Sequence, residues 1–357
     1  MADLPQRRID DRELRAEQPL AVERRDDALQ ALSGCDEVFG YHLHPKSMAK
    51  IFIATPARPG ARSGNLHTAT RWAAMLRGAG HRVQVGLARH GEPCDLLIAL
   101  HARRSHDSVV RYRGPRIVVL TGTDLYRDLP RSAQAKESLE LADRVIVLQD
   151  AAPLELKKSI QKKTRVVYQS SDTTLRHRPP AKPFRVAVVG HLREVKDPFR
   201  AALALAHLPG GALEVVQVGG ALEDGFAARA RRLMAQEPRY RWIGSVPHRR
   251  ALEWIARSHV LVVSSAMEGG ANVIAEAARI GTPVLASRMS GNVGMLGARY
   301  PGFYPLYDQR SLAGLIDRAI EEKNFHRRLK RSLRARRARF APAAERSALL
   351  AVVRSLL

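Results

Sequence analysis

Residues 260–286 have the clearest chemical use in the sequence. They read VLVVSSAMEGGANVIAEAARIGTPVLA, which predicts a buried strand ending at Ser264, a glycine turn around Glu268, and a helix starting near Asn272. Backbone N–H groups in such a turn and at a helix start are unpaired, and the helix dipole is positive there. Both features attract phosphate oxygens, so this segment predicts a binding site for a diphosphate.

Two carboxylates accompany the turn. Glu268 lies on it, and Glu276 lies eight residues further on, roughly one turn into the predicted helix, so both can face one ligand from different ends. One glutamate can then hold ribose hydroxyls while the other meets a sugar. A glycine turn beside a surface glutamate would account for the EGG triplet alone.

The elements that must position these residues form two series of short apolar runs separated by amphipathic stretches. This alternation is typical of parallel strands joined by crossover helices. The predicted strands are 51–54, 82–86, 96–100, 116–120, 145–148 and 166–168, followed by 185–189, 213–218, 240–243, 260–264 and 284–286. We expect an α/β protein with two Rossmann-like domains facing a central cleft.

The boundaries follow from changes in composition. Residues 171–184 contain Pro179, Pro180 and Pro183 among polar residues, and predict a linker. We expect a first domain at 50–172, a linker at 173–184 and a second domain at 185–339. A final helix at 340–357 can pack back on the first domain.

Residues 1–49 differ from the rest of the chain. They hold ten acidic and seven basic residues and have no clear apolar period. Met48 directly precedes the first predicted strand, which makes it a plausible true start. The alternative is a genuine but poorly ordered N-terminal tail.

The length and composition bound the function. The 357 residues favour two domains, and 45% hydrophobic with 26% charged residues is ordinary for a globular protein. Two cysteines, Cys35 and Cys94, exclude a disulfide framework, which favours a reducing compartment such as the cytoplasm. No apolar run approaches the ~18 residues of a membrane helix, and no signal peptide is evident.

The net charge of +24 invites a nucleic-acid interpretation. The arginines are spread through the whole chain, however, and aromatic residues make up only 5%, so platforms for base stacking are scarce. We therefore expect a small anionic substrate and no nucleic-acid partner. Eight of the thirteen residues 327–339 are basic, and Phe325, Leu329 and Leu333 form an apolar stripe. This pattern predicts a solvated helix closing the protein, with contact to an anionic membrane as the alternative.

The E-x7-E spacing followed by EAARIGTPVLA resembles the donor site of the large retaining-type GT-B glycosyltransferase family. The segment VAVVGHLREVK resembles that family's G-R-L-x-x-x-K loop, with His191 at the arginine position and Arg193 two residues on. Trp242, Ile243 and Gly244 match the segment that seats the base. The resemblance implies that a UDP-sugar is bound by Gly190, His191, Arg193, Lys196, Gly244, Glu268, Gly269, Gly270, Ala271, Asn272, Val273 and Glu276. Lys196 would neutralise the diphosphate.

A narrower resemblance extends to the acceptor side. The segments TPARPGARSGNLHTATRW, GEPCDLLIALHARRS, LTGTDLYRDLP and GHLREVKDPFRAALA are similar to the selenosugar synthases of selenoneine biosynthesis. This resemblance implies transfer of N-acetylglucosamine or glucose from UDP to selenophosphate, with phosphate lost to leave a 1-selenosugar. An ordinary transferase acting on a lipid-linked or polysaccharide acceptor is the alternative.

A small, multiply charged acceptor needs cations and N–H donors. Three sets of such residues follow predicted strands, where α/β clefts bind ligands: Arg58, Arg62, Gly64 and Asn65; His101, Arg103 and Arg104; Gly122, Thr123 and Asp124. His101 and Asp124 are the candidates for a catalytic base, and Glu268 is a further candidate catalytic residue. The thirteen histidines show no metal-ligand spacing, so neither a metal nor another cofactor is expected.

Overall fold

A computed structural model describes residues 48–57, 64–87 and 93–357. The chain divides into two units, Met1–Lys46 and Ser47–Leu357, and every element below belongs to the second unit. The predictions for the N-terminal extension, Arg58 and Arg62 concern residues outside the described ranges.

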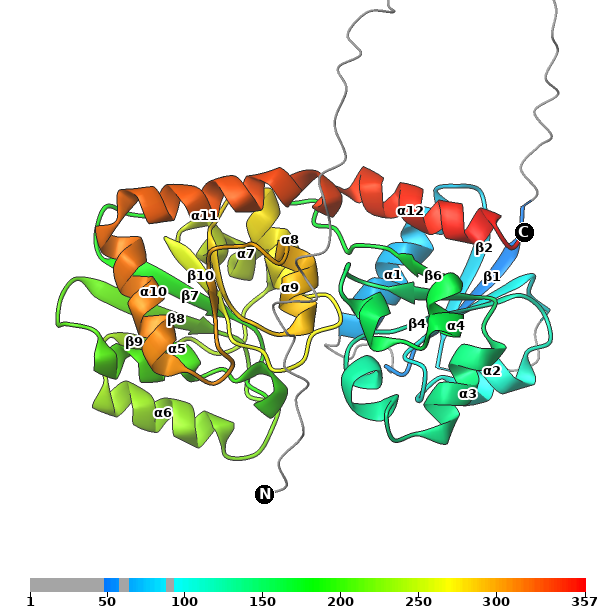
Figure 1. Cartoon of the computed structure of the whole chain (residues 1–357), viewed down its shortest axis with the longest axis horizontal. Coiled ribbons are helices and arrows are strands. Elements are labelled where there is room, and N and C mark those ends of the chain that lie inside the picture. The colour runs from blue at the N-terminus through cyan, green and yellow to red at the C-terminus, as the bar shows by residue number, and fades with distance from the viewer. Residues whose placement is uncertain (1–47, 58–63, 88–92) are drawn as a thin grey trace, which may run out of the picture. The chain divides into compact units, whose positions relative to one another are not determined.

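The second unit contains two parallel six-stranded sheets (Figure 1). The first has the order β2-β1-β3-β4-β5-β6 and the second the order β12-β11-β10-β7-β8-β9. The strands of the first sheet are β1 (Lys50–Ala54), β2 (Arg82–Gly86), β3 (Leu96–Leu100), β4 (Arg116–Val119), β5 (Arg144–Val147) and β6 (Thr164–Val166). Those of the second sheet are β7 (Phe184–Val189), β8 (Leu213–Val218), β9 (Tyr240–Trp242), β10 (Val260–Val263), β11 (Val284–Ser287) and β12 (Phe303–Tyr304).

The predicted two-domain α/β architecture is therefore correct, and all eleven predicted strands form. Their bounds agree to within one residue except at β6, which lies two residues earlier than predicted. The two-residue strand β12 was not predicted, because two residues at a sheet edge leave no alternating pattern to detect.

Apolar side chains on alternate faces of the first sheet explain its position inside the domain. Ile51 and Ile53 of β1 pack with Trp72 of α1, whereas Phe52 and Ala54 pack in a separate cluster on the other face. That other face is covered by α2, α3 and α4. The helical segments of this domain are α1 (Gly64–Arg77), α2 (His106–Arg111), η1 (Asp124–Asp128), α3 (Ala133–Leu141), η2 (Ala152–Glu155) and α4 (Lys158–Lys162).

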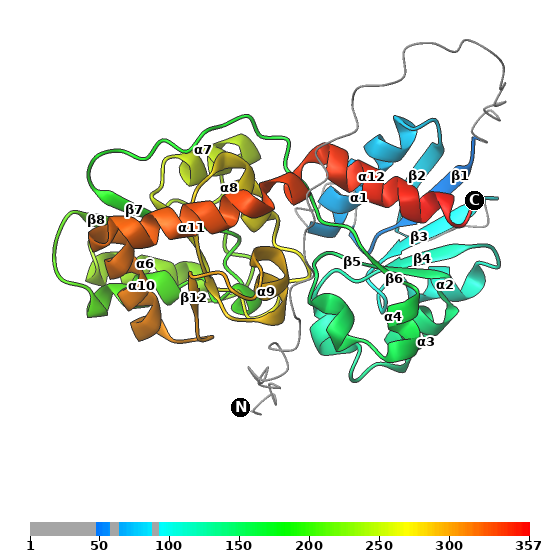
Figure 2. The ribbon, with the colours of Figure 1, turned by 45° about the horizontal axis from the view of Figure 1, so that its top comes forward.

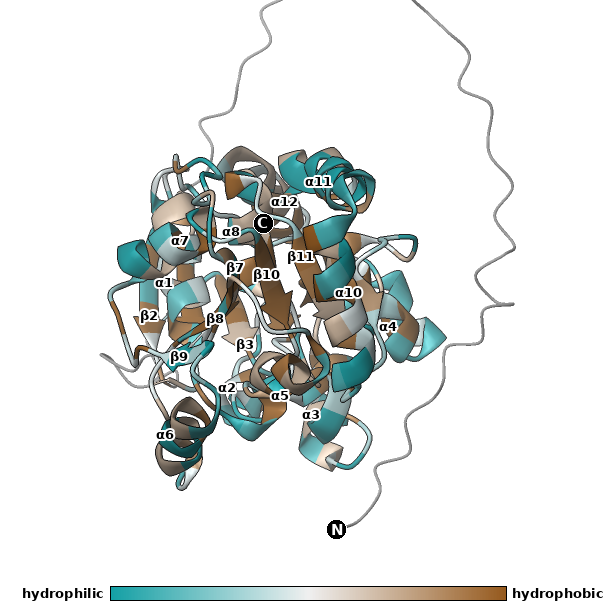
Figure 3. Ribbon diagram, turned by 90° about the vertical axis from the view of Figure 1, so that its left-hand side faces the viewer, coloured by the Kyte–Doolittle hydropathy of each residue, from teal (hydrophilic) through white to brown (hydrophobic). Residues whose placement is uncertain are grey.

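The second sheet is likewise enclosed. All four residues of β10 are buried, and Figure 3 shows this strand and β11 as apolar arrows between more polar helices. The helical segments here are η3 (Glu194–Lys196), α5 (Arg200–Ala204), η4 (Leu205–His207), α6 (Phe226–Gln236), α7 (His248–Ala256), α8 (Asn272–Ile280), α9 (Ser290–Leu296), α10 (Gln309–Glu321), α11 (Lys323–Arg336) and η5 (Arg337–Phe340).

The last helix, α12 (Pro342–Arg354), lies on the first domain although it follows the second in the chain (Figure 2). Leu349 and Val353 of α12 pack in the same core cluster as Trp72. The preceding helix α11 buries Phe325, Leu329 and Leu333 against the second domain, as the apolar stripe predicts.

A buried carboxylate fixes α12 to the first domain. The side chain of Glu345 has no exposed surface and accepts hydrogen bonds from Arg71 Nη2 at 3.1 Å, Trp72 Nε1 at 2.7 Å and the Ser170 backbone N–H at 2.8 Å. A buried charge is tolerated when it is paired and hydrogen-bonded in this way. Glu345 thus joins the last helix, α1 and the segment after β6.

The strand order of each sheet marks where a ligand can bind. In the second sheet the order reverses between β7 and β10, and in the first it reverses between β1 and β3. Loops leaving the two strands at such a point diverge, and the crevice between their carboxyl ends binds ligands in open α/β sheets. The segments after β7, β10, β1 and β3 are those that hold most of the predicted site residues.

Candidate active site

Two loops of the second domain meet at the reversal between β7 and β10. Ser264, the first residue after β10, donates its hydroxyl to the backbone carbonyls of Lys196 at 3.1 Å and Asp197 at 2.8 Å. The Ala266 N–H donates to the Val195 carbonyl at 2.9 Å. Asp197 has a left-handed backbone with φ of 42°, which turns the chain back after Lys196. The loop after β10 therefore holds the loop after β7 in place.

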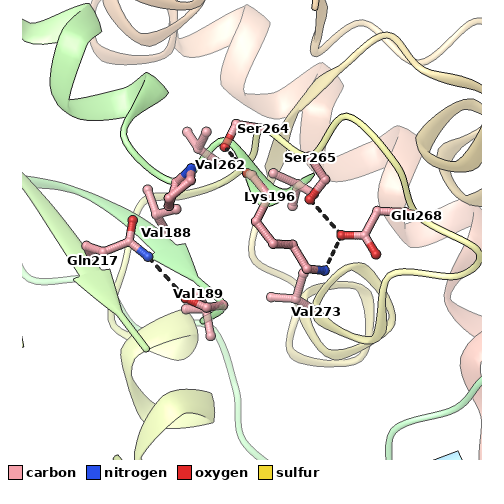
Figure 4. Close-up of a pocket in the computed structure, with 12 residues that line it drawn as sticks. Val188, Val189, Lys196, Gln217, Val262, Ser264, Ser265, Glu268 and Val273 are labelled. Carbon is pink, nitrogen blue, oxygen red and sulfur yellow. Dashed lines mark hydrogen bonds and ion pairs between the residues drawn. The ribbon is translucent and has the colours of Figure 1, made fainter. Parts of the chain in front are cut away.

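Lys196 and Glu268 form an ion pair across these loops (Figure 4). Glu268 Oε1 accepts from Lys196 Nζ and, at 2.6 Å, from Ser265 Oγ. The Lys196 side chain is 33% exposed, so its ammonium is accessible from solvent, whereas the Glu268 side chain is 10% exposed. Charge-assisted bonds of this kind fix the orientation of both groups.

The pair lies at a small pocket with an apolar floor. Val188, Val189, Val262 and Val273 line it together with the polar side chains of Lys196, Gln217, Ser264, Ser265 and Glu268 (Figure 4). Gln217 is fully buried, donates to the Gly190 carbonyl at 3.3 Å, and carries an Oε1 with no hydrogen-bond partner among the described residues. The pocket thus presents a cation, a carboxylate and an unused acceptor.

The glycine turn continues into α8 as predicted. Gly269 and Gly270 follow Glu268, Ala271 is the N-cap residue, and the helix begins at Asn272. Val273 at its second position lines the pocket described above. The first N–H groups of α8 are therefore presented beside the Lys196–Glu268 pair.

The Gly190 loop depends on a second glycine that sequence reasoning missed. Gly219 has φ of +147°, and a Cβ atom there would lie 2.0 Å from the Gly190 carbonyl oxygen. Trp242 Nε1 donates to the Gly219 carbonyl at 2.7 Å, and the Gly219 N–H donates to the Gly244 carbonyl at 2.8 Å. Gly219 therefore lets the predicted donor segments around Gly190 and Trp242 approach each other.

Two further predicted donor residues have partners on the loop after β8. His191 Nδ1 accepts from the Gly220 N–H at 3.1 Å. Arg193 Nε lies 3.5 Å from Glu223 Oε1, and its side chain is 45% exposed. The structure pairs Arg193 with Glu223, an acidic residue that the sequence did not single out.

Glu276 is the middle residue of α8 and is hydrogen-bonded to a histidine of the preceding helix. His248 Nε2 is 2.8 Å from Glu276 Oε1, and this hydrogen bond raises the pKa of His248 above its ordinary value. His248 is the first residue of α7, directly after the segment that contains Trp242, Ile243 and Gly244. No motif or spacing in the sequence marks His248 as a site residue.

In the first domain, Asp124 anchors the loop after β4. Its carboxylate is fully buried and accepts from the N–H groups of Ala102 at 3.0 Å, Thr121 at 2.8 Å and Gly122 at 2.9 Å. Its oxygens are occupied by backbone donors from two loops. The geometry fits a positioning role for this residue better than proton transfer.

His101 follows β3 with a left-handed backbone, φ of 74°, which is uncommon for a residue other than glycine. The Arg104 N–H donates to His101 Nδ1 at 3.3 Å, so the proton of the neutral ring lies on Nε2, which donates to Thr123 Oγ1 at 3.2 Å. Burial lowers the pKa of His101, and Asp124 and Asp128 oppose that shift. The ring is thus held neutral near neutral pH.

The remaining acceptor-side residues lie around this histidine and at the start of α1. Arg103 Nε donates to Asp128 Oδ2 at 2.8 Å, whereas Arg104 is exposed. Asp128 is another partner that the sequence did not reveal. Gly64 and Asn65 form the first turn of α1, where the Gly64 carbonyl accepts from Thr68 Oγ1 at 2.9 Å.

The loop after β4 of the first domain contacts the loop after β10 of the second domain. A Cβ atom on Gly122 would lie 2.7 Å from the Gly269 backbone nitrogen, and one on Gly269 would lie 2.4 Å from the Thr121 carbonyl. A Cβ atom on Gly270 would meet Leu148 of the first domain at 2.6 Å. Glycine is required at these positions because two backbones approach closely. The residue next to Glu268 therefore touches the loop that carries Thr123 and Asp124.

Neither a metal centre nor a membrane span is evident in the described ranges. Among those residues no group of three or more His, Cys, Asp or Glu side chains is arranged to hold a metal ion. No described helix combines the length and the apolarity that a bilayer crossing requires.

Known proteins resemble this chain in sequence over its second domain and in structure over most of its length. Residues 171–336 match the family model "Glycosyl transferases group 1". HepE of Anabaena, solved with UDP-glucose, is similar in structure, with a TM-score of 0.70 and 18% identity over 86% of this chain and all of the other. No curated protein matches the sequence.

Two further solved structures have the same fold. Sucrose-phosphate synthase from Thermosynechococcus elongatus has a TM-score of 0.71 and 19% identity, covering 86% of this chain and 98% of the other. The lipopolysaccharide outer core galactosyltransferase WaaB has a TM-score of 0.64 and 17% identity, covering 86% of this chain and all of the other. The chain thus has the GT-B fold, and residues 171–336, which include its second sheet, match the model of the group 1 glycosyltransferases.

Proposed function

We propose that this protein transfers a sugar from a UDP-sugar to selenophosphate. The observation that carries the donor half is the Lys196–Glu268 pair beside the start of α8, at the strand-order reversal of a group 1 glycosyltransferase domain. HepE, which has the same fold, was solved with UDP-glucose. That complex supports a UDP-sugar as the donor class.

Each donor-side group has a part in this reaction. The Lys196 ammonium and the first N–H groups of α8 stabilise the diphosphate of the departing UDP, because negative charge develops there as the bond to the sugar breaks. Glu276 accepts hydrogen bonds from the ribose hydroxyls. Glu268 is held by Ser265 at the edge of the pocket, where it faces the sugar. Arg193 and His191 lie on the same loop and complete its polar surface.

The acceptor supplies its own nucleophile. A selenium lone pair attacks C1 of the sugar, the C1–Se bond forms, and the C1–O bond to UDP breaks with its electron pair leaving on UDP. Water then cleaves the Se–P bond, giving inorganic phosphate and the 1-selenosugar. Because selenophosphate is already ionised, little base catalysis is needed, which agrees with an Asp124 that is occupied by backbone donors. Catalysis then depends mainly on holding the two anions together.

Two observations support selenophosphate as the acceptor. One is the resemblance to selenosugar synthases, and the other is a group of cationic side chains where the strand order of the first sheet reverses. Arg103 and Arg104 follow β3, and the first turn of α1 with Gly64 and Asn65 follows β1. These strands are neighbours at the place where the strand order reverses. Their loops supply guanidinium and N–H donors that suit a phosphate-like anion.

The direct test is to incubate the purified protein with UDP-glucose or UDP-N-acetylglucosamine and selenophosphate, and to analyse the products by mass spectrometry. We expect a selenium-containing hexose or N-acetylhexosamine together with UDP and inorganic phosphate. The Lys196→Ala variant should lose most of this product while keeping its melting temperature. Inorganic phosphate should compete with selenophosphate.

A different acceptor would give a different result. Sugar transfer that needs lipid vesicles or a polysaccharide end, without selenophosphate turnover, would overturn the acceptor while leaving the donor class in place. The exposed basic side chains of α11 would then be the first surface to examine for lipid contact.

A further inference from the structure

The contact between His248 and Glu276 joins two parts of the donor site. His248 is the first residue of α7 and lies four positions after Gly244, the last of the three residues 242–244 that the resemblance assigns to the base of the nucleotide. Glu276 belongs to α8 and is assigned to the ribose. Their 2.8 Å hydrogen bond therefore connects the base-side segment to the ribose-side carboxylate.

We propose that His248 is a positioning residue that fixes the Glu276 carboxylate for the ribose hydroxyls of the donor. The inference rests on the proposed function, because it takes Glu276 as the ribose partner. His248 Nε2–H donates to Oε1, which restrains rotation of the carboxylate and so fixes the direction of its second oxygen. A charge-assisted bond restrains a carboxylate more strongly than a neutral one does.

Groups from three sides face the histidine and keep it in place. Glu276 of α8 accepts its hydrogen bond, and Asp172 of the segment after β6 adds a negative charge. From α1 of the first domain, Arg71 acts in the opposite electrostatic sense, and the His67 ring lies edge-on at a centroid distance of 5.9 Å. The hydrogen bond to Glu276 and the negative charges of Glu276 and Asp172 raise the pKa of His248, against the lowering effects of burial and of Arg71. Protonation of His248 therefore strengthens its bond to Glu276.

The side chains differ in exposure in a way that suits this role. The Glu276 side chain is 12% exposed, whereas that of His248 is 57% exposed. The protein surrounds most of the Glu276 carboxylate, whereas an exposed histidine at a helix start contributes little to the core. Replacing His248 should therefore alter the ribose contact without unfolding the domain.

The test measures binding of UDP, 2′-deoxy-UDP and 3′-deoxy-UDP by titration calorimetry to wild type, His248→Ala, His248→Gln and Glu276→Ala. We expect His248→Ala to weaken UDP binding about five- to tenfold, since one hydrogen bond is involved. The same variant should weaken binding of 2′-deoxy-UDP and 3′-deoxy-UDP much less. His248→Gln keeps an N–H donor and should recover part of the loss.

The double variant separates positioning from a local structural effect. In a Glu276→Ala background, His248→Ala should cause no further loss, because the carboxylate that it positions is gone. The exposed His207→Ala on the same domain is the matched control and should bind all three nucleotides as wild type does. Melting temperatures of all variants should stay within a few degrees of one another.

The outcomes distinguish the inference from the proposed function. If wild type prefers UDP to its deoxy analogues and His248→Ala keeps that preference in full, the positioning role is wrong while the donor class stands. The positioning role is also wrong if His248→Ala weakens UDP binding by the same factor in the Glu276→Ala background as in wild type. If wild type binds none of the three nucleotides, the proposed function fails, and the inference fails with it.

Discussion

Two buried carboxylates at strand ends, Asp124 in the first domain and Glu268 in the second, have opposite surroundings. Asp124 is fully buried and accepts from three backbone N–H groups of its own and a neighbouring loop. Glu268 is bound by the side chains of Lys196 and Ser265 at the edge of a pocket. A carboxylate that satisfies backbone donors shapes a loop, whereas one paired with an accessible cation can exchange partners with a ligand.

The largest effect should follow from removing the loop anchor. Asp124→Ala leaves the N–H groups of Ala102, Thr121 and Gly122 without their acceptor in a buried site. The expected loss is about 3 kcal/mol of unfolding free energy, measured by urea denaturation. Asp124→Asn keeps one acceptor oxygen and should lose clearly less. Equal stability of Asp124→Ala and wild type would show that water replaces the carboxylate and that Asp124 does not anchor the loop.

The ion pair should show the reverse pattern, with activity lost and stability kept. Lys196→Ala removes an accessible ammonium that we assign to the donor diphosphate. Charge-assisted hydrogen bonds of about 1.5–3 kcal/mol correspond to a roughly ten- to hundredfold lower kcat/KM for the UDP-sugar. The melting temperature should change little, because the side chain is partly exposed. Unaltered kinetics would remove Lys196 from the donor site.

Much of the second domain's site is predictable because its signals are local. The buried run of β10, the glycines after it and the helix start at Asn272 all lie within thirteen residues, and each has a direct backbone consequence. The alternating apolar faces of β1 and β3 likewise fix the first sheet. The fold class and nearly all strands therefore follow from short windows of sequence.

The partners of the site residues are not local and could not be predicted. His248 meets Glu276 across 28 positions, and Gly219 is required by a carbonyl 29 positions earlier. Glu345 resembles an ordinary surface acid in the first turn of the last helix, yet it is fully buried against Arg71 and Trp72. Patterns of residue type do not encode which of many charged side chains will meet in space.

Two half-buried histidines, His177 and His259, show how burial affects stability at low pH. Burial lowers the pKa of His177 and of His259 to about 4, and nearby Lys330 and His326 act in the same direction. A lowered folded-state pKa means that the unfolded chain binds more protons below pH 6.5. The contribution of the two neutral histidines to the free energy of unfolding is therefore complete above pH 6.5 and declines as the pH falls toward 4.

Urea unfolding at pH 7.5, 6 and 5 measures this decline. His259→Asn keeps an acceptor for the Arg185 N–H, which donates to His259 Nδ1 at 2.9 Å, but it cannot be protonated. We expect the variant to lose less stability between pH 7.5 and 5 than wild type does. The same decline in both proteins would assign the acid sensitivity to other groups.

The smallest effect should separate two neighbouring arginines on the acceptor side. Arg103 is already paired with Asp128, which offsets its charge, whereas Arg104 is exposed beside His101. If selenophosphate is the acceptor, Arg104→Ala should raise its KM about three- to tenfold, and Arg103→Ala should raise it less. The KM for the UDP-sugar should stay nearly constant in both variants, because the donor is bound by the second domain. A larger rise in the selenophosphate KM for Arg103→Ala would mean that the Arg103–Asp128 pair opens when the acceptor binds. An equal change in the KM values for selenophosphate and for the UDP-sugar would show that these arginines do not belong to a separate acceptor site.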